Sequence, residues 1–130
     1  MSFVLCSFWL TVVIGAAETD RTVLMDLFNS TNGLKWSNNT GWGSNRPITE
    51  WHGVSCDSNG NVISLFLEGN QLSGSIPESF GGLVNLTVLS LKGNQLSGSI
   101  PESLGGLVNL LYFFIDVNHL SGSIPESFGG

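Results

Sequence analysis

Residues 83–106 read LVNLTVLSLKGNQLSGSIPESLGG, and residues 107–130 read LVNLLYFFIDVNHLSGSIPESFGG. An earlier copy, NGNVISLFLEGNQLSGSIPESFGG, occupies residues 59–82. Each unit is 24 residues long, and its apolar residues recur at the same places. A fixed period of this length indicates a stack of similar units, because each unit buries its apolar face against its neighbours. The sequence therefore predicts a solenoid of three coils.

Stacking places equivalent residues of the coils in columns, and the apolar columns should form the core. Short strands at about 64–68, 88–92 and 112–116 are expected to pair in parallel. Asn70, Asn94 and Asn118 recur after these strands, where an amide side chain can satisfy unpaired turn backbone. The predicted inward columns are Val62, Leu86, Leu110; Leu65, Leu89, Phe113; Leu67, Leu91, Ile115; Leu72, Leu96, Leu120; and Ile76, Ile100, Ile124.

The pattern L-x-x-L-x-L-x-x-N-x-L with this period is typical of leucine-rich repeats. The predicted fold class is therefore an α/β solenoid, with the short parallel strands lining its concave face. Variation between the copies collects at the outward positions of these strands, which alternate with the inward ones. The predicted ligand-binding residues are Ser64, Phe66, Glu68, Val88, Ser90, Lys92, Tyr112, Phe114 and Asp116.

The aromatic members of this set carry the binding hypothesis. Phe66, Tyr112 and Phe114 should be exposed, and exposed aromatic side chains often anchor interfaces. The alternative is that they pack on one another along the sheet and only stabilise it. The sequence leaves both interpretations open.

Residues 18–58 do not repeat and are expected to form an N-terminal cap. A helix should start with Thr19 or Asp20 as its N-cap and end near residues 29–33. Trp36, Trp42 and Trp51 follow in a polar stretch, and three tryptophans should be buried over the open end of the first coil.

The stretch DRTVLMDLFNSTNGLKW, the Trp51-to-Cys56 segment WHGVSC, and the L-x-G-x-I-P repeats resemble plant-type leucine-rich-repeat proteins. The resemblance covers about residues 20–130. In that family the cap usually carries a cysteine pair, but Thr49 stands where the first cysteine is expected. The resemblance therefore implies a cap without its disulfide, similar to variants from algae, oomycetes and bacteria.

The first residues suggest export. Residues 3–17 form an uncharged, mostly apolar run that ends in small residues, so residues 1–17 are predicted to be a signal peptide. The run is shorter than the roughly 20 residues of a membrane span. The mature chain should then begin near Ala17 or Glu18, without a membrane span, and be secreted or held at the cell surface. Asn29, Asn38 and Asn85 begin Asn-x-Thr sequons and become candidate glycosylation sites. Cys56 would remain as a lone cysteine, expected to be buried.

Other functional classes find little support. The net charge is −6, and four Lys and Arg residues without a cluster argue against nucleic-acid binding. His52 and His119 belong to no catalytic motif, so no enzyme activity and no catalytic residue are predicted. Asp57, Asn59, Asn61 and Glu68 match positions of a calcium loop, but Val62 replaces its required glycine. We therefore expect neither a metal site nor a cofactor.

The leading hypothesis is a secreted or cell-surface recognition module that binds a protein, peptide or glycan. The alternative is the N-terminal ectodomain part of a larger receptor-like protein, with a receptor kinase as one form. A third hypothesis, an ice-binding surface, rests on serine columns such as Ser73, Ser97 and Ser121. The last repeat lacks a polar capping coil, so its apolar edge is also expected to promote self-association.

Overall fold

The computed structural model describes the backbone of residues 15–125 and the side chains of residues 19–125. Helix α2 (Gly15–Ser30) precedes two short 3-10 helices, η1 (Gly33–Lys35) and η2 (Ile48–Glu50). The coils follow, with strands and 3-10 helices in a repeating order. These elements are β1 (Val54–Cys56), β2 (Val62–Phe66), β3 (Ser73–Gly74), η3 (Glu78–Gly82), β4 (Val88–Ser90), β5 (Gln95–Ser99), η4 (Glu102–Gly106), β6 (Tyr112–Phe114) and β7 (His119–Ser121).

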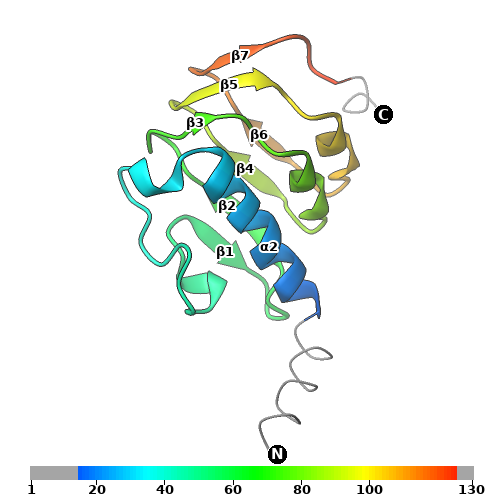
Figure 1. Cartoon of the computed structure of the whole chain (residues 1–130). Helices are drawn as coiled ribbons and strands as arrows, with labels where there is room; N and C mark the ends of the chain where they lie inside the picture. Colours follow the sequence, from blue (N-terminus) through cyan, green and yellow to red (C-terminus); the bar gives the residue numbers. More distant parts are fainter. Residues whose placement is uncertain (1–14, 126–130) are drawn as a thin grey trace, which may run out of the picture.

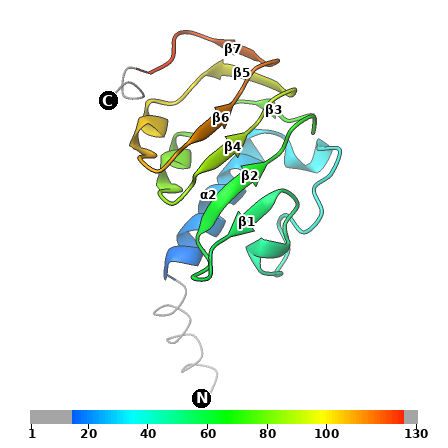
Figure 2. The same cartoon turned by 180° about the vertical axis from the view of Figure 1, so that it is seen from behind.

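The main sheet has the order β1-β2-β4-β6, and the last three strands run in parallel (Figures 1 and 2). Leu65 pairs with Leu89 and Leu89 with Phe113, so equivalent residues of the repeats are neighbours. This register confirms the predicted parallel strands and columns. Strands β4 and β6 are shorter than expected, and β2 begins and ends two residues earlier than expected, so Glu68, Lys92 and Asp116 lie beyond the strand ends.

A second sheet, β3-β5-β7, lies on the opposite side of the coils (Figure 1). The sequence analysis did not predict it, since Ser-Gly-Ser segments carry no alternation of apolar and polar residues. Gly74, Gly98 and Gly122 have positive φ, a backbone conformation that glycine adopts without the steric cost of a side chain. Pro77 and Pro101 stand directly before η3 and η4, where the missing N–H of proline costs no hydrogen bond.

The core lies between the two sheets and continues under the cap. Leucines of the first two coils are completely buried at the predicted columns, including Leu65, Leu72, Leu89 and Leu96. The tryptophans Trp36, Trp42 and Trp51 are also buried, as expected. Their rings form one cluster with Phe28, with neighbouring ring centroids 4.8–6.0 Å apart. This cluster belongs to the cap, at the opposite end of the stack from β7 (Figure 1).

The asparagine column is a hydrogen-bonded ladder. Asn94 Oδ1 accepts the backbone N–H groups of Asn70 and Leu72, at 2.9 and 3.0 Å. Its amide nitrogen donates to the carbonyls of Leu67 and Leu91. At the cap end, Asn70 exchanges two hydrogen bonds with the backbone of Asn38. The predicted role of the column is confirmed, and the ladder extends one step further, into the cap.

The expected N-cap at Thr19 or Asp20 is wrong. Helix α2 covers Gly15–Ser30, so Thr19 and Asp20 lie inside it and not at its N-cap. The buried Asp20 carboxylate instead accepts the N–H of Val62 at 2.9 Å and so joins α2 to β2. Burial raises the pKa of Asp20, the Val62 hydrogen bond opposes that shift, and the charge of Asp57 adds to it.

Strand β1 was not anticipated either. It pairs antiparallel with β2, so the cap adds one strand to the main sheet and closes its N-terminal edge. Among the described residues, the structure contains no helix with the length and hydropathy that a membrane crossing requires. Most of the predicted signal peptide, residues 1–14, lies outside the described residues.

Candidate functional site

The concave face, which we define as the outward side of the strands β2, β4 and β6, is a small array of side chains in register. Ser64, Val88 and Tyr112 form one row across the strands. A second row contains the other side chains at the ends of these strands, Phe66, Ser90 and Phe114. A third row, beyond the strand ends, contains Glu68, Lys92 and Asp116. The structure therefore brings all nine predicted residues to one side of the sheet.

The aromatic side chains dominate this face. Phe66, Tyr112 and Phe114 are 47%, 57% and 44% exposed. Tyr112 and Phe114 lie two residues apart on β6, and their rings are nearly parallel with centroids 6.3 Å apart. Phe66 belongs to β2, two strands away, which corresponds to about 10 Å. Tyr112 and Phe114 therefore stack on each other within β6, and all three aromatic residues remain about half exposed.

Ser90 was predicted to be a ligand-binding residue, but its side chain is completely buried. Its short side chain lies in register between Phe66 and Phe114 and donates a hydrogen bond to Glu68 Oε2. The larger side chains of Phe66 and Phe114 on the adjacent strands flank Ser90 and shield it from solvent. Ser90 therefore supports the face by holding the Glu68 carboxylate and has no surface for a ligand.

Charged side chains form one rim of the face. Lys92 Nζ lies 3.8 Å from Asp116 Oδ2, and both side chains are at least half exposed. Glu68 is exposed and held by Ser90. Two carboxylates and one ammonium group give this rim a net charge of −1. The face thus combines an apolar aromatic part with a weakly acidic edge.

The first row is less open than expected. Ser64 and Val88 are only partly exposed. The hydroxyl oxygen of Ser64 is buried and has no hydrogen-bond partner among the described residues. A buried hydroxyl without a partner costs free energy, so it favours a ligand or water that can reach it. Tyr112 alone gives this row a large exposed surface.

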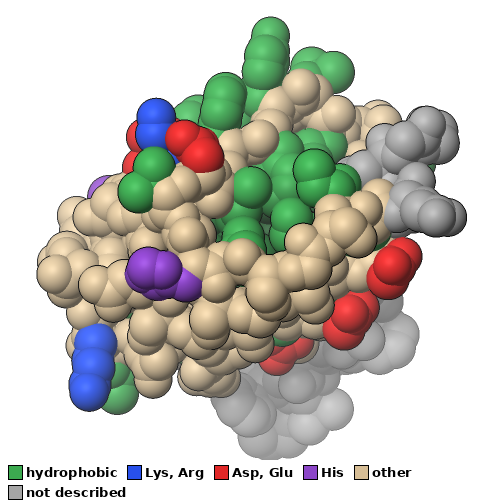
Figure 3. Space-filling model, turned by 90° about the horizontal axis from the view of Figure 1, so that it is seen from above, with side chains coloured by type: hydrophobic (Ala, Val, Ile, Leu, Met, Phe, Trp, Pro, Cys, Tyr) green, Lys and Arg blue, Asp and Glu red, His purple; other side chains and the backbone are tan. Residues whose placement is uncertain are grey.

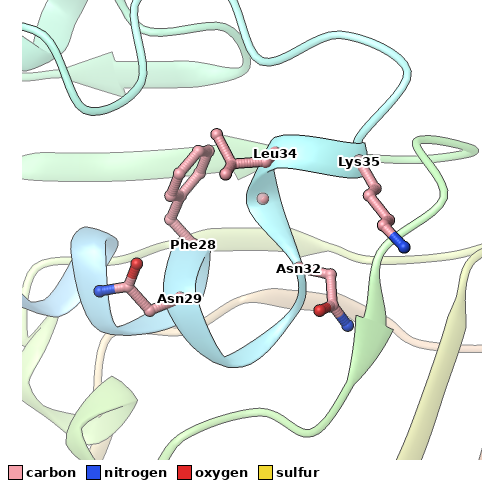
Figure 4. Close-up of a pocket in the computed structure, with 6 residues that line it drawn as sticks. Phe28, Asn29, Asn32, Leu34 and Lys35 are labelled. Carbon is pink, nitrogen blue, oxygen red and sulfur yellow. The ribbon is translucent and has the colours of Figure 1, made fainter.

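The cap contains a hollow beside the C-terminal end of α2, which was not predicted from the sequence. It has a volume of about 240 Å³ and is lined by Phe28, Asn29, Asn32, Gly33, Leu34 and Lys35 (Figure 4). Leu34 is 86% exposed. A leucine that follows the polar stretch of residues 29–33 was the one sequence feature that could have indicated this hollow. Gly33 packs against the Phe28 ring so closely that any added Cβ would overlap it. The hollow is shallow and contains no catalytic constellation.

The chemical candidates remain separate in the structure. Residues 19–125 contain no group of three His, Cys, Asp or Glu side chains arranged for a metal ion. Asp57, from the calcium-like spacing, instead accepts backbone N–H groups of Asn59 and Asn61 within its own turn. These hydrogen bonds lower the pKa of Asp57. Cys56 is a free thiol and only partly buried, which corrects the expectation of full burial. Burial and the nearby charges of Asp20 and Asp57 raise its pKa, so the thiol resists ionisation.

The last coil exposes apolar surface, as Figure 3 shows from above. Phe113, Ile115 and Leu120 are partly exposed, whereas their equivalents in the first two coils are completely buried. Ile124 is 68% exposed, and Ile76 at the equivalent position is buried. A neighbour on the far side of β6 and β7 would cover these residues.

The sequon asparagines differ in their surroundings. Asn29 lies exposed on α2, but Thr31 of its sequon is completely buried and donates to the Leu27 carbonyl. Asn38 is exposed in the cap. Asn85 is partly buried before β4, and Thr87 donates its hydroxyl hydrogen to the Ile63 carbonyl.

The chain belongs to the leucine-rich-repeat family, whose model matches residues 43–96 and 61–120. No curated protein sequence matches the chain. The solved structures that resemble it include leucine-rich-repeat ectodomains of plant receptors, which agrees with the resemblance to plant-type proteins.

Three solved structures illustrate the similarity. The BIR2 ectodomain from Arabidopsis thaliana has 32% identity and a TM-score of 0.75, over 84% of this chain and 60% of that one. The Arabidopsis receptor kinase HAESA ectodomain, in complex with an IDA peptide hormone, has 32% identity and a TM-score of 0.68, over 88% and 19%. A Bacteroides eggerthii leucine-rich-repeat protein has 33% identity and a TM-score of 0.54, over 62% and 13%. The chain therefore spans less than two thirds of each of these chains.

Proposed function

We propose that this chain is an extracellular recognition module that binds a peptide or an extended protein segment on its concave face. The observation that carries the proposal is the set of half-exposed aromatic side chains on one face of the sheet, Phe66 on β2 and the stacked pair Tyr112 and Phe114 on β6. These aromatic side chains stay exposed, whereas the inward residues Leu65 and Leu89 on β2 and β4 are completely buried. A similar solved ectodomain, that of HAESA, is in complex with a peptide hormone, which supports a peptide ligand here.

The face suits one kind of segment best. An apolar or aromatic side chain of the ligand would pack on Tyr112 and Phe114, whose rings are nearly parallel. A basic side chain would lie at the rim, near Glu68 and Asp116. A glycan would use the same aromatic rings but gain less from the acidic rim, so it is the second ligand class.

The proposed route to the cell surface uses residues 1–17 as a signal peptide, followed by the cap from residue 18 to 58 and three coils over 59–130. The uncharged run that ends in small residues supports this division. Sequencing the N-terminus of exported material tests it. A first residue near Ala17 or Glu18 is expected, and exported chains that retain Met1 would contradict the signal peptide.

Panning a random peptide phage library on the immobilised protein tests the binding proposal. The triple variant Phe66→Ser, Tyr112→Ser, Phe114→Ser should lose the enriched peptides, because the aromatic contacts are gone. A matched control, Leu34→Ser, Val84→Ser, Val108→Ser, removes three exposed apolar side chains away from the face and should retain them. Thermal unfolding of both variants shows that the fold persists. Equal peptide capture by both variants would contradict a concave-face site.

The second candidate is that the chain is the N-terminal part of a larger receptor-like protein, including a receptor kinase. The small coverage of the HAESA chain, 19%, favours it. In this case the concave face would be one part of a longer binding surface, and any enzyme activity would reside elsewhere. Sequencing the transcript beyond the codon for Gly130 decides the matter.

A second copy of the chain is also a proposed partner, through the last coil. Phe113 on β6, Ile115 after it and Leu120 on β7 are partly exposed, and a sheet edge with apolar neighbours promotes association. Sedimentation at increasing concentration should show dimers, which Leu120→Glu should weaken. A wild-type chain that stays monomeric at high concentration would contradict this.

A further inference from the structure

The three Asn-x-Thr sequons share one motif but have three different local structures. In a sequon the hydroxyl at the third position must be able to approach the asparagine carboxamide, which becomes the attachment point of the glycan. The local conformation of residues two apart therefore separates a usable sequon from a coincidental one.

Asn38 and Thr40 already have this arrangement. Asn38 Oδ1 accepts a hydrogen bond from the Thr40 hydroxyl at 2.7 Å and another from the Thr40 backbone N–H at 3.0 Å. Both residues are exposed. These contacts join residues only two apart, so this turn depends on local sequence and can form before the coils assemble.

The fold also leaves the Asn38 amide nitrogen available. The asparagine ladder uses only the backbone N–H and carbonyl of Asn38, which bond to the side chain of Asn70. Within residues 19–125, the Asn38 amide nitrogen itself makes no hydrogen bond. A glycan attached there would therefore not disturb the ladder.

The other two sequons lack these features. Asn29 lies in α2, where residues two apart point to different sides of the helix. The hydroxyl of Thr31 is buried and donates to Leu27. In the third sequon Leu86, between Asn85 and Thr87, is completely buried, and the Thr87 hydroxyl bonds to the neighbouring coil.

We infer that Asn38 is the principal N-glycan acceptor of this chain, an inference that rests on the proposed export from a eukaryotic cell. The donor would be an oligosaccharide linked to a polyisoprenyl pyrophosphate. The Asn38 nitrogen forms a bond to the anomeric carbon of the first sugar and loses a proton. The bond between that carbon and the phosphate oxygen breaks, and the lipid pyrophosphate leaves with the electron pair.

The position of Asn38 fits a recognition module. Asn38 belongs to the cap, while Tyr112 and Phe114 lie on β6 at the other edge of the main sheet. A glycan on Asn38 would cover the N-terminal end of the ladder and leave this aromatic pair open. The modification and the proposed binding site are therefore compatible.

The test is cell-free translation of the full chain with eukaryotic microsomes, once with residues 1–17 and once with a known secretory leader in their place. Protease protection identifies chains that entered the lumen, and endoglycosidase treatment with peptide mass spectrometry locates the glycan. We expect a mobility shift that Thr40→Ala abolishes and Thr40→Ser restores. The controls Asn29→Gln and Asn85→Gln should keep the shift.

The outcomes separate the two proposals. If chains are protected and glycosylated on Asn38 with the substituted leader but not with residues 1–17, export through residues 1–17 is contradicted. The assignment of Asn38 as acceptor is then supported. Protected chains without a glycan on Asn38, or with equal or higher occupancy on Asn29 or Asn85, would overturn the inference. Far-ultraviolet circular dichroism of the purified Thr40→Ala protein verifies that the loss of the shift does not reflect unfolding.

Discussion

The two ends of the coil stack use similar apolar residues but differ in how they are covered. At the cap end, the cluster of Phe28, Trp36, Trp42 and Trp51 is buried, and β1 closes the edge of the main sheet. At the other end, Phe113 is partly exposed on β6, the last strand of the main sheet. Each repeat therefore supplies apolar side chains, but these become buried only when another coil or the cap packs against them. The cap is that layer at one end, built from residues that do not repeat.

The largest effect should come from breaking the covered end. Trp51→Ala removes the most buried tryptophan of the cluster and should lower the free energy of unfolding by about 3–5 kcal/mol. Leu111→Ala, at a residue 73% exposed near the open end, should change it by less than about 0.5 kcal/mol. Urea titrations of both variants measure the difference. Equal losses of unfolding free energy in Trp51→Ala and Leu111→Ala would mean that packing in the cap contributes no more than the open end.

The asparagine ladder gives the next comparison. Asn94→Ala leaves the N–H groups of Asn70 and Leu72 and two carbonyls without their partner in a buried place. We expect a loss of about 3 kcal/mol, since each unsatisfied buried group costs about 1–3 kcal/mol. Asn118→Ala, nearer the open end, should cost less than half as much, because Asn118 is only partly buried and its hydrogen bonds lie closer to solvent. A larger loss for Asn118→Ala would show that the last coil is as closed as the first two.

The cationic side chains near the two ends should also differ in how much they stabilise the fold. Arg21 donates to the Ser44 and Arg46 carbonyls and lies 5.1 Å from the Trp51 ring centroid. Arg21→Met should therefore cost about 1–2 kcal/mol in unfolding free energy. Lys92→Met removes an exposed ion pair with Asp116 and should cost less than about 0.5 kcal/mol. Thermal unfolding at low and high salt distinguishes them: only the small Lys92 effect should disappear at high salt.

The smallest effect is a pH dependence located in the cap. The pKa of Asp20 is raised by burial above its ordinary value of 3.8. Its contribution to stability is thus fully present below that value and is lost as pH rises through the folded-state pKa. Asp20→Asn keeps an acceptor for Val62 and should be more stable than wild type at pH 7, with no gain below pH 3.8.

Asp57 provides the control of opposite sign, because its pKa is lowered by hydrogen bonds from Asn61 and its turn. Its contribution is present above the unfolded-state pKa and is lost as pH falls through the folded-state value. Asp57→Asn should therefore be less stable than wild type at pH 7. Unfolding midpoints measured from pH 3 to 8 give both slopes. A destabilised Asp20→Asn at pH 7 would contradict the burial argument.

The regular part of the fold could be predicted because its causes are local or repeated. A recurring asparagine has few roles other than satisfying turn backbone, and the ladder confirms this for Asn70 and Asn94. The second sheet could not be predicted, since Ser-Gly-Ser segments become strands only when the stacking aligns their backbones.

The sequence predicted which residues lie on the concave face, but it did not predict how exposed each side chain is. The pattern placed Ser90 on the outward side correctly, yet its exposure depends on the size of Phe66 and Phe114 on the neighbouring strands. The role of Asp20 was missed for a similar reason. Its partner, Val62, is 42 residues away, and no local signal indicates that contact.

The direction of the asparagine ladder has a consequence for biosynthesis. Asn94 completes the hydrogen bonds of Asn70, which lies 24 residues earlier, and Asn118 does the same for Leu96. A coil on the ribosome therefore becomes fully satisfied only when the asparagine of the following coil has emerged. Because chains emerge from the N-terminus, the cap can assemble first and each coil can then dock on a finished one. Folding should thus trail synthesis by one repeat, with the newest coil always the least protected from proteases and hydrogen exchange.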